Sequence, residues 1–463
     1  MADLRIYRKL IRNLIKVVFK TNSIDGRISL TGTNGGNLIM GRKMNKTEWS
    51  WVLYDVGNSA FTMLTTALVP IYFAAMVAKT STIDPNEATA LWGTANSIAI
   101  MILALLSPIL GAIADYRGMK KRMFGVALSV GVLGAFAMAV MNTWLAFLVI
   151  YVIARIGYSA TNVFYDSMLT DVTTDDRMDR VSSNGFAYGY IGSCIPFILC
   201  LAIYIIQPFG LNDNSAIQVA FVITALWWFF LTIPLFKNVR QTYYLENKKG
   251  KVKEAFSRLA TTFKNIKEKK DIFIFILAYF FYIDGVYTII TMATIYGTEL
   301  GLDSVSMVLA LLLTQFIAFP CAIIAGILGT KYGTLKIIKV FIGIYMFVAV
   351  FGFFLVTEWQ FWVLAVIVGM AQGGIQSLSR GFFGRIIPKK ESNEFFGFFD
   401  IFGKLADIMG PLLMGLFAII TGHSRYGILS LILLFAVGFI LLSKLPKGFG
   451  DIKLKAEDQV LTE

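Results

Sequence analysis

Ionisable side chains inside long apolar runs are the feature of this sequence that points most directly to chemistry. Asp284 lies within the run 272–297, about 18 Å along a helix from the start of the run and near the middle of a hydrocarbon layer about 30 Å thick. A charge at that depth costs about 2.5 to 3.5 kcal/mol on insertion scales. Asp284 is therefore expected to face a cavity, a partner or a coupling proton. The alternative is a neutral carboxyl group that bonds a neighbouring helix.

Polar residues at steps of three and four give two further runs one polar face each, because this spacing matches the helical repeat. The run 144–168 has Arg155, Asn162 and Asp166, and the run that starts at 359 ends with Gln372, Gln376 and Arg380. These faces predict a lined central pathway, unless they only hydrogen-bond the helices together. Arg155 favours a pathway, since a guanidinium keeps its charge and binds carboxylate or phosphate groups.

Two more runs carry polar residues. Asp55 and Asn58 lie nearer the inner end of the run 51–78, where a structural role in the first turn is an equal alternative. The run 396–421 has Asp400, Lys404 and Asp407, which form either a neutralised structural triad or a switch that substrate or a proton opens.

The single histidine, His423, lies in a predicted outer loop, so proton coupling must use carboxylates. Asp284 is the first candidate for the coupling group and Asp407 the second. Sodium coupling through the same oxygen atoms is the alternative.

The elements that position these residues are predicted to be membrane helices. Hydrophobic residues make up 57% of the 463 residues and charged residues 15%, and about twelve apolar runs are long enough to cross a membrane. The runs are 51–78, 88–114, 122–141, 144–168, 182–206, 216–236, 272–297, 304–328, 335–357, 359–379, 396–421 and 425–443. They lack the alternating polarity of a membrane barrel. The predicted fold is an all-α membrane protein with two pseudo-symmetric six-helix bundles.

The distribution of charge predicts the orientation. The net charge of +13 comes largely from basic residues in alternate loops, such as Arg117 to Arg122 and Arg385 to Lys390. By the positive-inside rule both termini are predicted to be cytoplasmic. The basic residues are therefore expected to set the orientation in a lipid bilayer rather than to bind nucleic acid. The predicted parts are a basic amphipathic extension (1–47), a first bundle (48–236), a basic cytoplasmic linker (237–271), a second bundle (272–443) and a cytoplasmic tail (444–463). A translation start at Met40 or Met44 would remove most of the extension.

The loop after the second run, GAIADYRGMKKR, combines glycines with an acid and basic residues. Its candidate gating residues are Gly111, Asp115, Arg117, Gly118, Lys121 and Arg122. An echo in the second half, GILGTKYGTLKI, aligns Gly326, Gly333 and Lys336 with Gly111, Gly118 and Lys121, and a weaker echo aligns Asn162 with Gln376 and Asp166 with Arg380. The loop is predicted to form an inner-surface charge cluster in only one of two access states, unless it is merely a topology signal.

These motifs resemble the major facilitator superfamily, whose corresponding loop reads G-x-x-x-D-R-x-G-R-R. Here Arg117 stands one place later than the usual arginine, and Thr330 replaces the acid in the second copy. Within the superfamily, WVLYDVGNSAF (51–61), YIDGVYT (282–288) and the segment 373–415 are similar to the autophagy-linked vacuolar effluxers of fungi and their bacterial relatives. The resemblance implies alternating access by a secondary transporter in a bacterial plasma membrane, and amino-acid efflux in the eukaryotic relatives.

Motifs of other function classes do not occur in the sequence. GxxxxGK[ST], HExxH and GxSxG are missing, so neither an ATP motor nor an enzyme is expected. Cys194, Cys200 and Cys321 have no metal-binding spacing, and no cofactor or metal is predicted. The expected function is ion-coupled transport of a small polar solute, with outward movement of amino acids as the leading case. A membrane receptor or scaffold and a lipid or lysolipid flippase are the alternatives.

Overall fold

The computed structural model describes residues 43–80, 85–246, 251–264 and 269–451. Nearly all of these residues are helical, and within them only Tyr116 and Leu245 form an isolated bridge of extended backbone. The prediction of an all-α fold is confirmed. The amphipathic stretch predicted near the N-terminus and most of the predicted tail lie outside the described residues.

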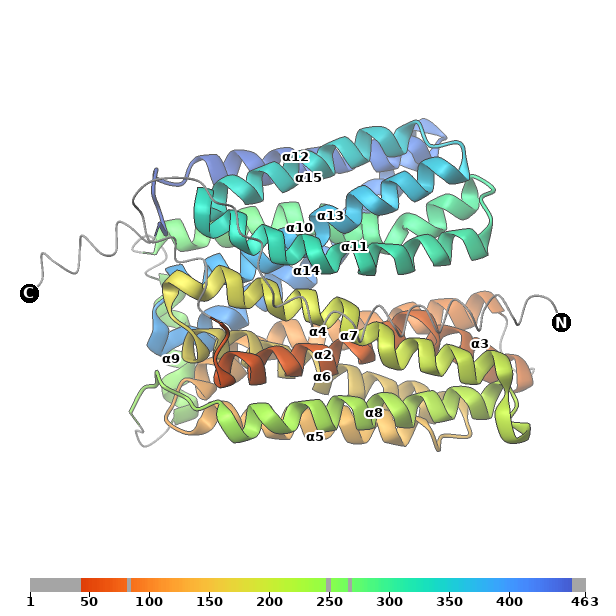
Figure 1. Cartoon of the computed structure of the whole chain (residues 1–463), viewed down its shortest axis with the longest axis horizontal. Helices are drawn as coiled ribbons and strands as arrows, with labels where there is room; N and C mark the ends of the chain where they lie inside the picture. The colour runs from red at the N-terminus through yellow and green to blue at the C-terminus, as the bar shows by residue number, and fades with distance from the viewer. Residues whose placement is uncertain (1–42, 81–84, 247–250, 265–268, 452–463) are drawn as a thin grey trace, which may run out of the picture. The chain divides into compact units, whose positions relative to one another are not determined.

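The first half of the chain forms one bundle, drawn from red to green in Figure 1. Its helices are α2 (Lys46–Ala67), α3 (Val69–Thr80), α4 (Pro85–Ala114), α5 (Met119–Met138), α6 (Trp144–Val172), α7 (Met178–Ile206) and α8 (Asp213–Asn238). Short 3-10 helices precede α7 and α8 at Asp175–Arg177 and Pro208–Gly210. These helices fall close to the six runs predicted for this half.

The second half forms the other bundle, drawn from green to blue in Figure 1. Its helices are α10 (Lys270–Glu299), α11 (Ser304–Tyr332), α12 (Thr334–Phe353), α13 (Glu358–Ile386), α14 (Ser392–Thr421) and α15 (Ser424–Ser443), with a 3-10 turn at Lys389–Glu391. Between the halves, the basic linker contains α9 (Lys251–Lys264), which packs on α4. In α14 the side chain of Asp407 is not described.

The first predicted span, 51–78, is two helices that meet at Leu68. Pro70 explains the break, because its nitrogen cannot donate to the preceding turn. Helix α3 has only 12 residues, and α2 carries polar side chains. Eleven helices in the described part of the chain, rather than about twelve, are therefore long and apolar enough to cross a membrane on their own.

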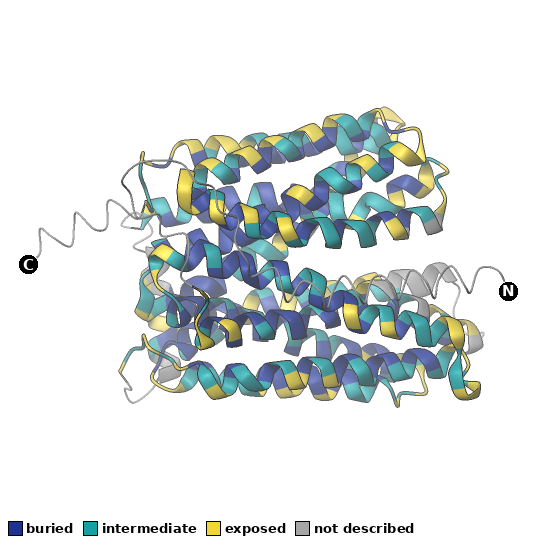
Figure 2. Cartoon of the chain, in the orientation of Figure 1, coloured by how far each residue is buried: buried dark blue, intermediate teal, exposed yellow. Residues whose placement is uncertain are grey.

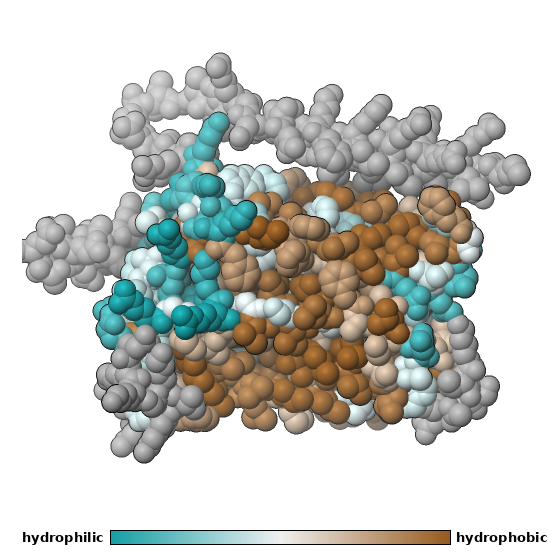
Figure 3. All heavy atoms as spheres, turned by 90° about the horizontal axis from the view of Figure 1, so that it is seen from below, coloured by the Kyte–Doolittle hydropathy of each residue, from teal (hydrophilic) through white to brown (hydrophobic). Residues whose placement is uncertain are grey.

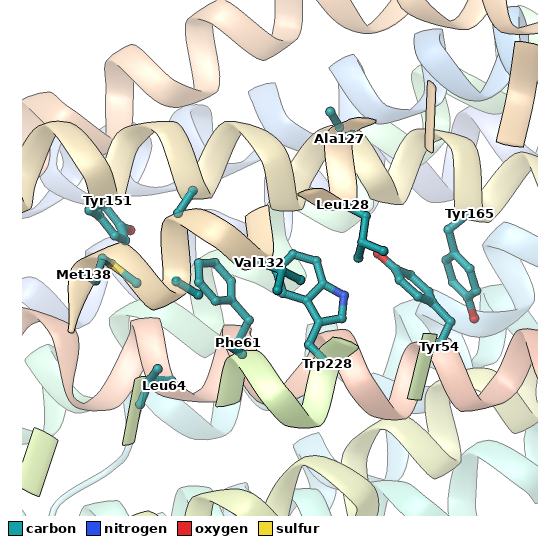
Figure 4. Close-up of a cluster of buried hydrophobic side chains, with 14 of the residues drawn as sticks. Tyr54, Phe61, Leu64, Ala127, Leu128, Val132, Met138, Tyr151, Tyr165 and Trp228 are labelled. Atoms are coloured by element: carbon teal, nitrogen blue, oxygen red, sulfur yellow. The ribbon is translucent and has the colours of Figure 1, made fainter. Parts of the chain in front are cut away.

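Small and aromatic residues pack the first bundle. A Cβ atom on Gly131 of α5 would lie 2.5 Å from the ring of Trp228, and one on Gly134 would lie 2.7 Å from Ala154 of α6. Trp228 is fully buried, with its ring 5.5 Å from that of Phe61 (Figure 4). Close van der Waals contact of this kind stabilises helix bundles in lipid, where association gains no hydrophobic driving force.

The surface of the chain has the polarity of an integral membrane protein. Seen from below, hydrophobic residues form a wide band, and hydrophilic residues gather at its two ends (Figure 3). Buried residues follow the helix faces that point into each bundle, and exposed ones the outward faces (Figure 2). The chain is a multi-pass integral membrane protein.

Candidate functional site

Arg380 of α13 joins the second half of the chain to the first. Its guanidinium Nη1 lies 2.9 Å from Oδ1 of Asp166 on α6, and Nη2 lies 3.3 Å from Oδ2 of Asp55 on α2. It also donates to the hydroxyl and the carbonyl oxygen of Ser182 on α7, both at 3.0 Å. Arg380 is only 4% exposed, so a buried guanidinium brings together ionisable groups from three helices.

Aromatic rings surround the guanidinium. Its central carbon lies 4.1 Å from the ring centre of Phe186, 4.7 Å from that of Trp51 and 5.5 Å from that of Tyr165. Such rings attract a cation through their quadrupole. Gly185 makes room for the group, because a Cβ atom there would lie 2.8 Å from Arg380 and 2.9 Å from Asp55.

This cluster lies towards the helix ends that the basic loops predict to be cytoplasmic. Asp166 and Arg380 each lie six residues from the inner end of their helix, about 9 Å at 1.5 Å per residue. The side chain of Asp166 is 25% exposed and that of Arg380 5%. The two residues that the sequence echo aligned are therefore direct partners, and Asp166 is the more accessible of the two.

The other residues of the predicted polar faces make separate contacts. Asn162 accepts a hydrogen bond from Asn58 at 2.7 Å within the first half, and Gln376 accepts one from Tyr190 at 3.0 Å across the halves. Gln372 is buried on the same helix, α13.

In α14, Lys404 is paired with Asp400, which also accepts a hydrogen bond from Ser107 of α4 at 2.7 Å. The polar faces thus contribute to the contact between the halves.

Arg155 of α6 differs from these residues. Its side chain is partly exposed and lies 5.7 Å from the ring centre of Tyr158. Lys404 is close enough for the two positive charges to repel each other. Among the side chains that the structure describes, no acid forms an ion pair with Arg155.

Asp284 lies inside the second bundle, apart from the Arg380 cluster. It is fully buried in α10 and accepts a hydrogen bond from the backbone N–H of Gly410 in α14 at 2.8 Å, and one from Thr288 at 3.4 Å. Gly410 precedes Pro411, whose nitrogen has no hydrogen to donate. The carboxyl group therefore ties α10 to the middle of α14, where Pro411 leaves out one helical hydrogen bond. A coupling role for Asp284 stays a prediction.

Asp115 joins the end of α4 to the start of α14. It accepts hydrogen bonds from the backbone and side-chain nitrogens of Asn393, both at 2.9 Å, and from the backbone of Glu394 at 3.2 Å. These N–H groups belong to the first turn of α14, where a negative charge is favoured by the helix dipole. Arg258 of α9 pairs with Asp115 at 3.0 Å and also with Glu394. Burial raises the pKa of Asp115 to about 7, against the opposing effects of Asn393 and Arg258.

The predicted gating loop contributes one basic residue to this contact, and that residue is Lys120. Its ammonium group is buried, 2.6 Å from Asp171 and 3.2 Å from Ser392 of α14. The expectation that Lys121 and Arg122 join the cluster is wrong, because successive helix residues point about 100° apart. Lys121 instead bonds the carbonyl oxygens that end α8, those of Phe236 at 2.6 Å and Val239 at 2.9 Å.

Arg117 also turns away from the cluster, towards the ring of Tyr244 at 5.3 Å. Gly118 begins α5 with a φ of +73°, a conformation that glycine adopts without strain.

The second copy of the loop, in the second half of the chain, makes contacts similar to those of the first copy. Gly333 has a φ of +97°, and a Cβ atom on Gly326 would lie 2.7 Å from Ser183 of α7. Asp179 at the start of α7 pairs with Arg385 and accepts a hydrogen bond from Thr334 at 2.5 Å. Sequence reasoning missed Asp179, Arg385, Asp171 and Arg258, because charges at helix ends look like ordinary positive-inside loops. Only the glycine echo signalled that these ends meet.

Most of the described hydrogen bonds and ion pairs between the two halves lie towards the helix ends with the basic loops, and the bond from Tyr190 to Gln376 lies near the middle of α7. Lys389 and Asp175 add a further pair at 2.5 Å at the inner surface. In the described residues the two halves are therefore in contact on the side that the basic loops predict to be cytoplasmic.

Comparisons with known proteins agree with this architecture. The family model described as "Vacuole effluxer Atg22 like" matches residues 86–178 and 170–448. "Uncharacterized MFS-type transporter YxiO" of Bacillus subtilis is 45% identical over 414 residues, which cover 88% of this chain and 96% of that protein. "Autophagy-related protein 22" of Saccharomyces cerevisiae is 24% identical over 424 residues, 79% of this chain and 80% of that protein.

Solved structures show the same fold at low identity. The fucose transporter FucP in its outward conformation superposes with a TM-score of 0.65 at 14% identity, over 86% of this chain and 98% of that one. The proton:xylose symporter XylE gives a TM-score of 0.66 at 12% identity, over 88% and 95%. The chain belongs to the Atg22-like family of the major facilitator superfamily, and it is a secondary transporter rather than an enzyme.

Proposed function

We propose that the protein exports a small solute that bears a carboxylate, with amino acids as the first candidates, in exchange for protons. The observation that supports this proposal is the pairing of Arg380 with Asp55 and Asp166, since it joins the two halves through ionisable groups inside the membrane. Charged groups at such depth are costly and mark substrate or ion pathways.

Asp166 is the coupling carboxylate in this proposal. In the inner-closed state its charge faces Arg380 of the opposite half, and part of its side chain is accessible. Opening of the inner side separates the two groups, and a carboxylate without a neighbouring cation takes up a proton more readily. An ion can drive a conformational change only if it binds the two states differently. A group between the halves meets that condition.

Asp284, which the sequence placed first, is the second candidate for the coupling group in this proposal. Its hydrogen-bond partners Thr288 and Gly410 belong to the same half as Asp284 itself. Movement of one half against the other changes these contacts less than it changes the Asp166–Arg380 pair. Asp166 is therefore our first candidate for the coupling group.

Arg155 is proposed to hold the carboxylate of the solute. Among the charged residues of the polar faces, Arg380 and Lys404 are paired with acids, whereas Arg155 forms no ion pair with the described residues. A guanidinium binds a carboxylate through two parallel hydrogen bonds, which fixes the orientation of the solute.

The transport cycle follows from these roles. A proton from outside neutralises Asp166 and frees Arg380, which weakens the contact between the halves and lets the inner side open. The solute binds Arg155 from the cytoplasm, and the proton leaves to the same side. Renewed pairing of Asp166 with Arg380 closes the inner side and carries the solute outward.

Flux through liposomes tests the proposal. The purified protein is reconstituted, a proton gradient is imposed with a pool of labelled amino acids, and wild type is compared with Asp166→Asn. We expect gradient-driven flux in wild type and at least about tenfold less in the variant, because the asparagine cannot carry the proton. Glu299→Gln, at the exposed outer end of α10, is the matched control and should transport like wild type.

Each other outcome points to a different interpretation. Flux that survives Asp166→Asn but not Asp284→Asn or Asp407→Asn would move coupling into the second bundle, and flux driven only by a sodium gradient would replace the proton. If the folded wild type moves no amino acid, the amino-acid proposal is wrong. Transport of lysolipid, or ligand binding without transport, would then be measured next.

A further inference from the structure

Four basic residues gather around one pocket beside the gating loop. Arg117, Lys121, Arg122 and Arg240 line it together with Gln241 and Tyr244, and its volume is about 580 Å³. It lies where α5 begins and α8 ends, on the cytoplasmic side of the first bundle. The transport mechanism proposed above uses none of these four side chains.

The pocket has an ordered wall. The Gln241 side chain accepts a hydrogen bond from Gly118 at 2.9 Å and donates to the carbonyl oxygen of Ala114 at 3.2 Å. Leu245 pairs with the backbone of the loop on both sides, to Arg117 at 3.0 Å and to Asp115 at 2.9 Å. The segment after α8 and the gating loop are thus fastened together, and the basic side chains project from a defined frame.

The positive charge of the pocket is not balanced within the described part of the chain. None of the ion pairs there includes any of the four basic residues. Arg117, Arg122 and Arg240 are exposed, and the described partners of Lys121 are carbonyl oxygens and the face of the Phe236 ring. A group with one or more negative charges would therefore be attracted to this place.

An apolar groove continues from the pocket into the membrane. The groove has a volume of about 840 Å³ and shares Lys121 and Arg122 with the pocket. Its other lining residues are mainly Gly125, Val126, Val130 and Leu133 of α5 and Phe229 and Phe236 of α8. From Arg122 to Leu133 the helix rises about 16 Å, close to half of a hydrocarbon layer about 30 Å thick. The groove therefore spans one leaflet.

We propose that this site binds an anionic phospholipid of the inner leaflet, with its headgroup phosphate in the pocket and one acyl chain in the groove. The shape and charge of the site match such a molecule, because cations lie at the depth of the headgroups and the apolar groove runs along the direction of the acyl chains. Basic pockets between membrane helices on the cytoplasmic side are a recurring form of lipid-headgroup recognition. A soluble phosphate would use the pocket but leave the groove empty.

Native mass spectrometry of the full chain in detergent tests the headgroup. The protein is titrated with phosphatidylglycerol, with phosphatidylcholine of the same chains, and with glycerol phosphate. We expect phosphatidylglycerol to bind at least fivefold more tightly than either of the others. The double variant Arg122→Gln and Arg240→Gln should lose that preference. The control is Lys331→Gln with Lys336→Gln, in the equivalent loop of the second half, and it should keep the preference.

A separate variant tests whether an acyl chain binds in the groove. A Cβ atom on Gly125 would lie 3.4 Å from the end of the Phe236 ring, an ordinary contact, so a side chain there is tolerated and fills the groove. Gly125→Leu should weaken phosphatidylglycerol binding while glycerol phosphate binding stays unchanged.

Three results would overturn the proposal. Equal binding of phosphatidylglycerol and phosphatidylcholine would exclude recognition of the anionic headgroup. Glycerol phosphate binding as tight as that of the lipid would make this a soluble-phosphate site. Unchanged lipid binding in Gly125→Leu, or in the double arginine variant with its thermal stability intact, would place the lipid elsewhere.

Discussion

Gly111 lies where α4 crosses the first turn of α14, and the space for its side chain is already occupied. A Cβ atom there would collide with the backbone carbonyl of Asn393, and backbone cannot move aside as a flexible side chain can. Gly111→Ala should therefore keep the inner ends of the halves apart. Cysteines at positions 175 and 389, where an ion pair of 2.5 Å now joins the halves, report the change, and their cross-linking should fall several-fold.

A glycine in open space gives the control for this measurement. Gly343 of α12 has no atom within 4 Å of the Cβ position and lies mid-helix. Gly343→Ala should leave the cross-linking unchanged. Undiminished cross-linking in Gly111→Ala would show that the first turn of α14 can yield, and that the glycine is not needed for closure.

At the scale of one element, the start of α2 depends on Glu48. Asn45 and Glu48 form a capping box, each bonding the other's backbone N–H at 2.8 Å. The same carboxylate binds Arg177 through two hydrogen bonds of 2.8 and 2.7 Å and accepts a third from Thr173. Glu48 thus ties the first turn of α2 to the turn between α6 and α7.

Substitution of Glu48 tests that connection. Glu48→Gln leaves a buried amide facing Arg177, and we expect a loss of about 3 kcal/mol in the free energy of unfolding, at the lower end of the range for broken buried ion pairs. Thermal unfolding in detergent measures it. Glu358→Gln, in the exposed first turn of α13, should change the melting temperature little. Equal melting of both variants would mean that the ion pair of Glu48 with Arg177 does not stabilise the start of α2.

Much of the element order could be predicted from the sequence, because continuous apolar runs and positive-inside loops are local signals. The glycine echo aligned Gly111 with Gly326 and Gly118 with Gly333, and the structure places the first two at close approaches between helices and the last two at left-handed turns. Asp166 and Arg380 were both named, since their helical spacing gives each helix a polar face. The break at Leu68 was not predicted, although Pro70 carried the signal.

The contacts between elements could not be predicted in the same way. Which lysine of the pair Lys120 and Lys121 faces α14 depends on the rotation of α5, which no local pattern fixes. The partner of Asp115 comes from α9, more than a hundred residues later in the chain. The bond from Gly410 to Asp284 depends on how α10 and α14 pack. Tertiary packing decides all three.

At the scale of the whole transporter, Asp115 gives the closed inner side a pH dependence. Its pKa is about 7 when the halves are together. It falls towards the ordinary value near 4 when opening exposes the carboxyl group to water. The closed state therefore binds the proton more tightly, so acid favours closure, and this advantage is lost as the pH rises through about 7.

Cross-linking of the 175 and 389 cysteines between pH 8 and pH 6 measures this effect. The background should carry Asp166→Asn, because proton uptake at Asp166 acts in the opposite direction. We expect the ratio of closed to open protein to rise by about tenfold in total from pH 8 to pH 6, and Asp115→Asn to abolish the change. A pH dependence that persists in Asp115→Asn would assign the titration to another group.

Trp51 gives the transporter a built-in optical label. Its ring stacks on Tyr165 at 4.4 Å and faces the Arg380 guanidinium of the opposite half. Tyr165 belongs to the same half and moves with it, whereas Arg380 departs when the inner side opens and water takes its place. Indole emission shifts to longer wavelength in wet surroundings. With the other seven tryptophans replaced by phenylalanine, the colour of one fluorophore would follow the transport cycle in real time, without any attached dye.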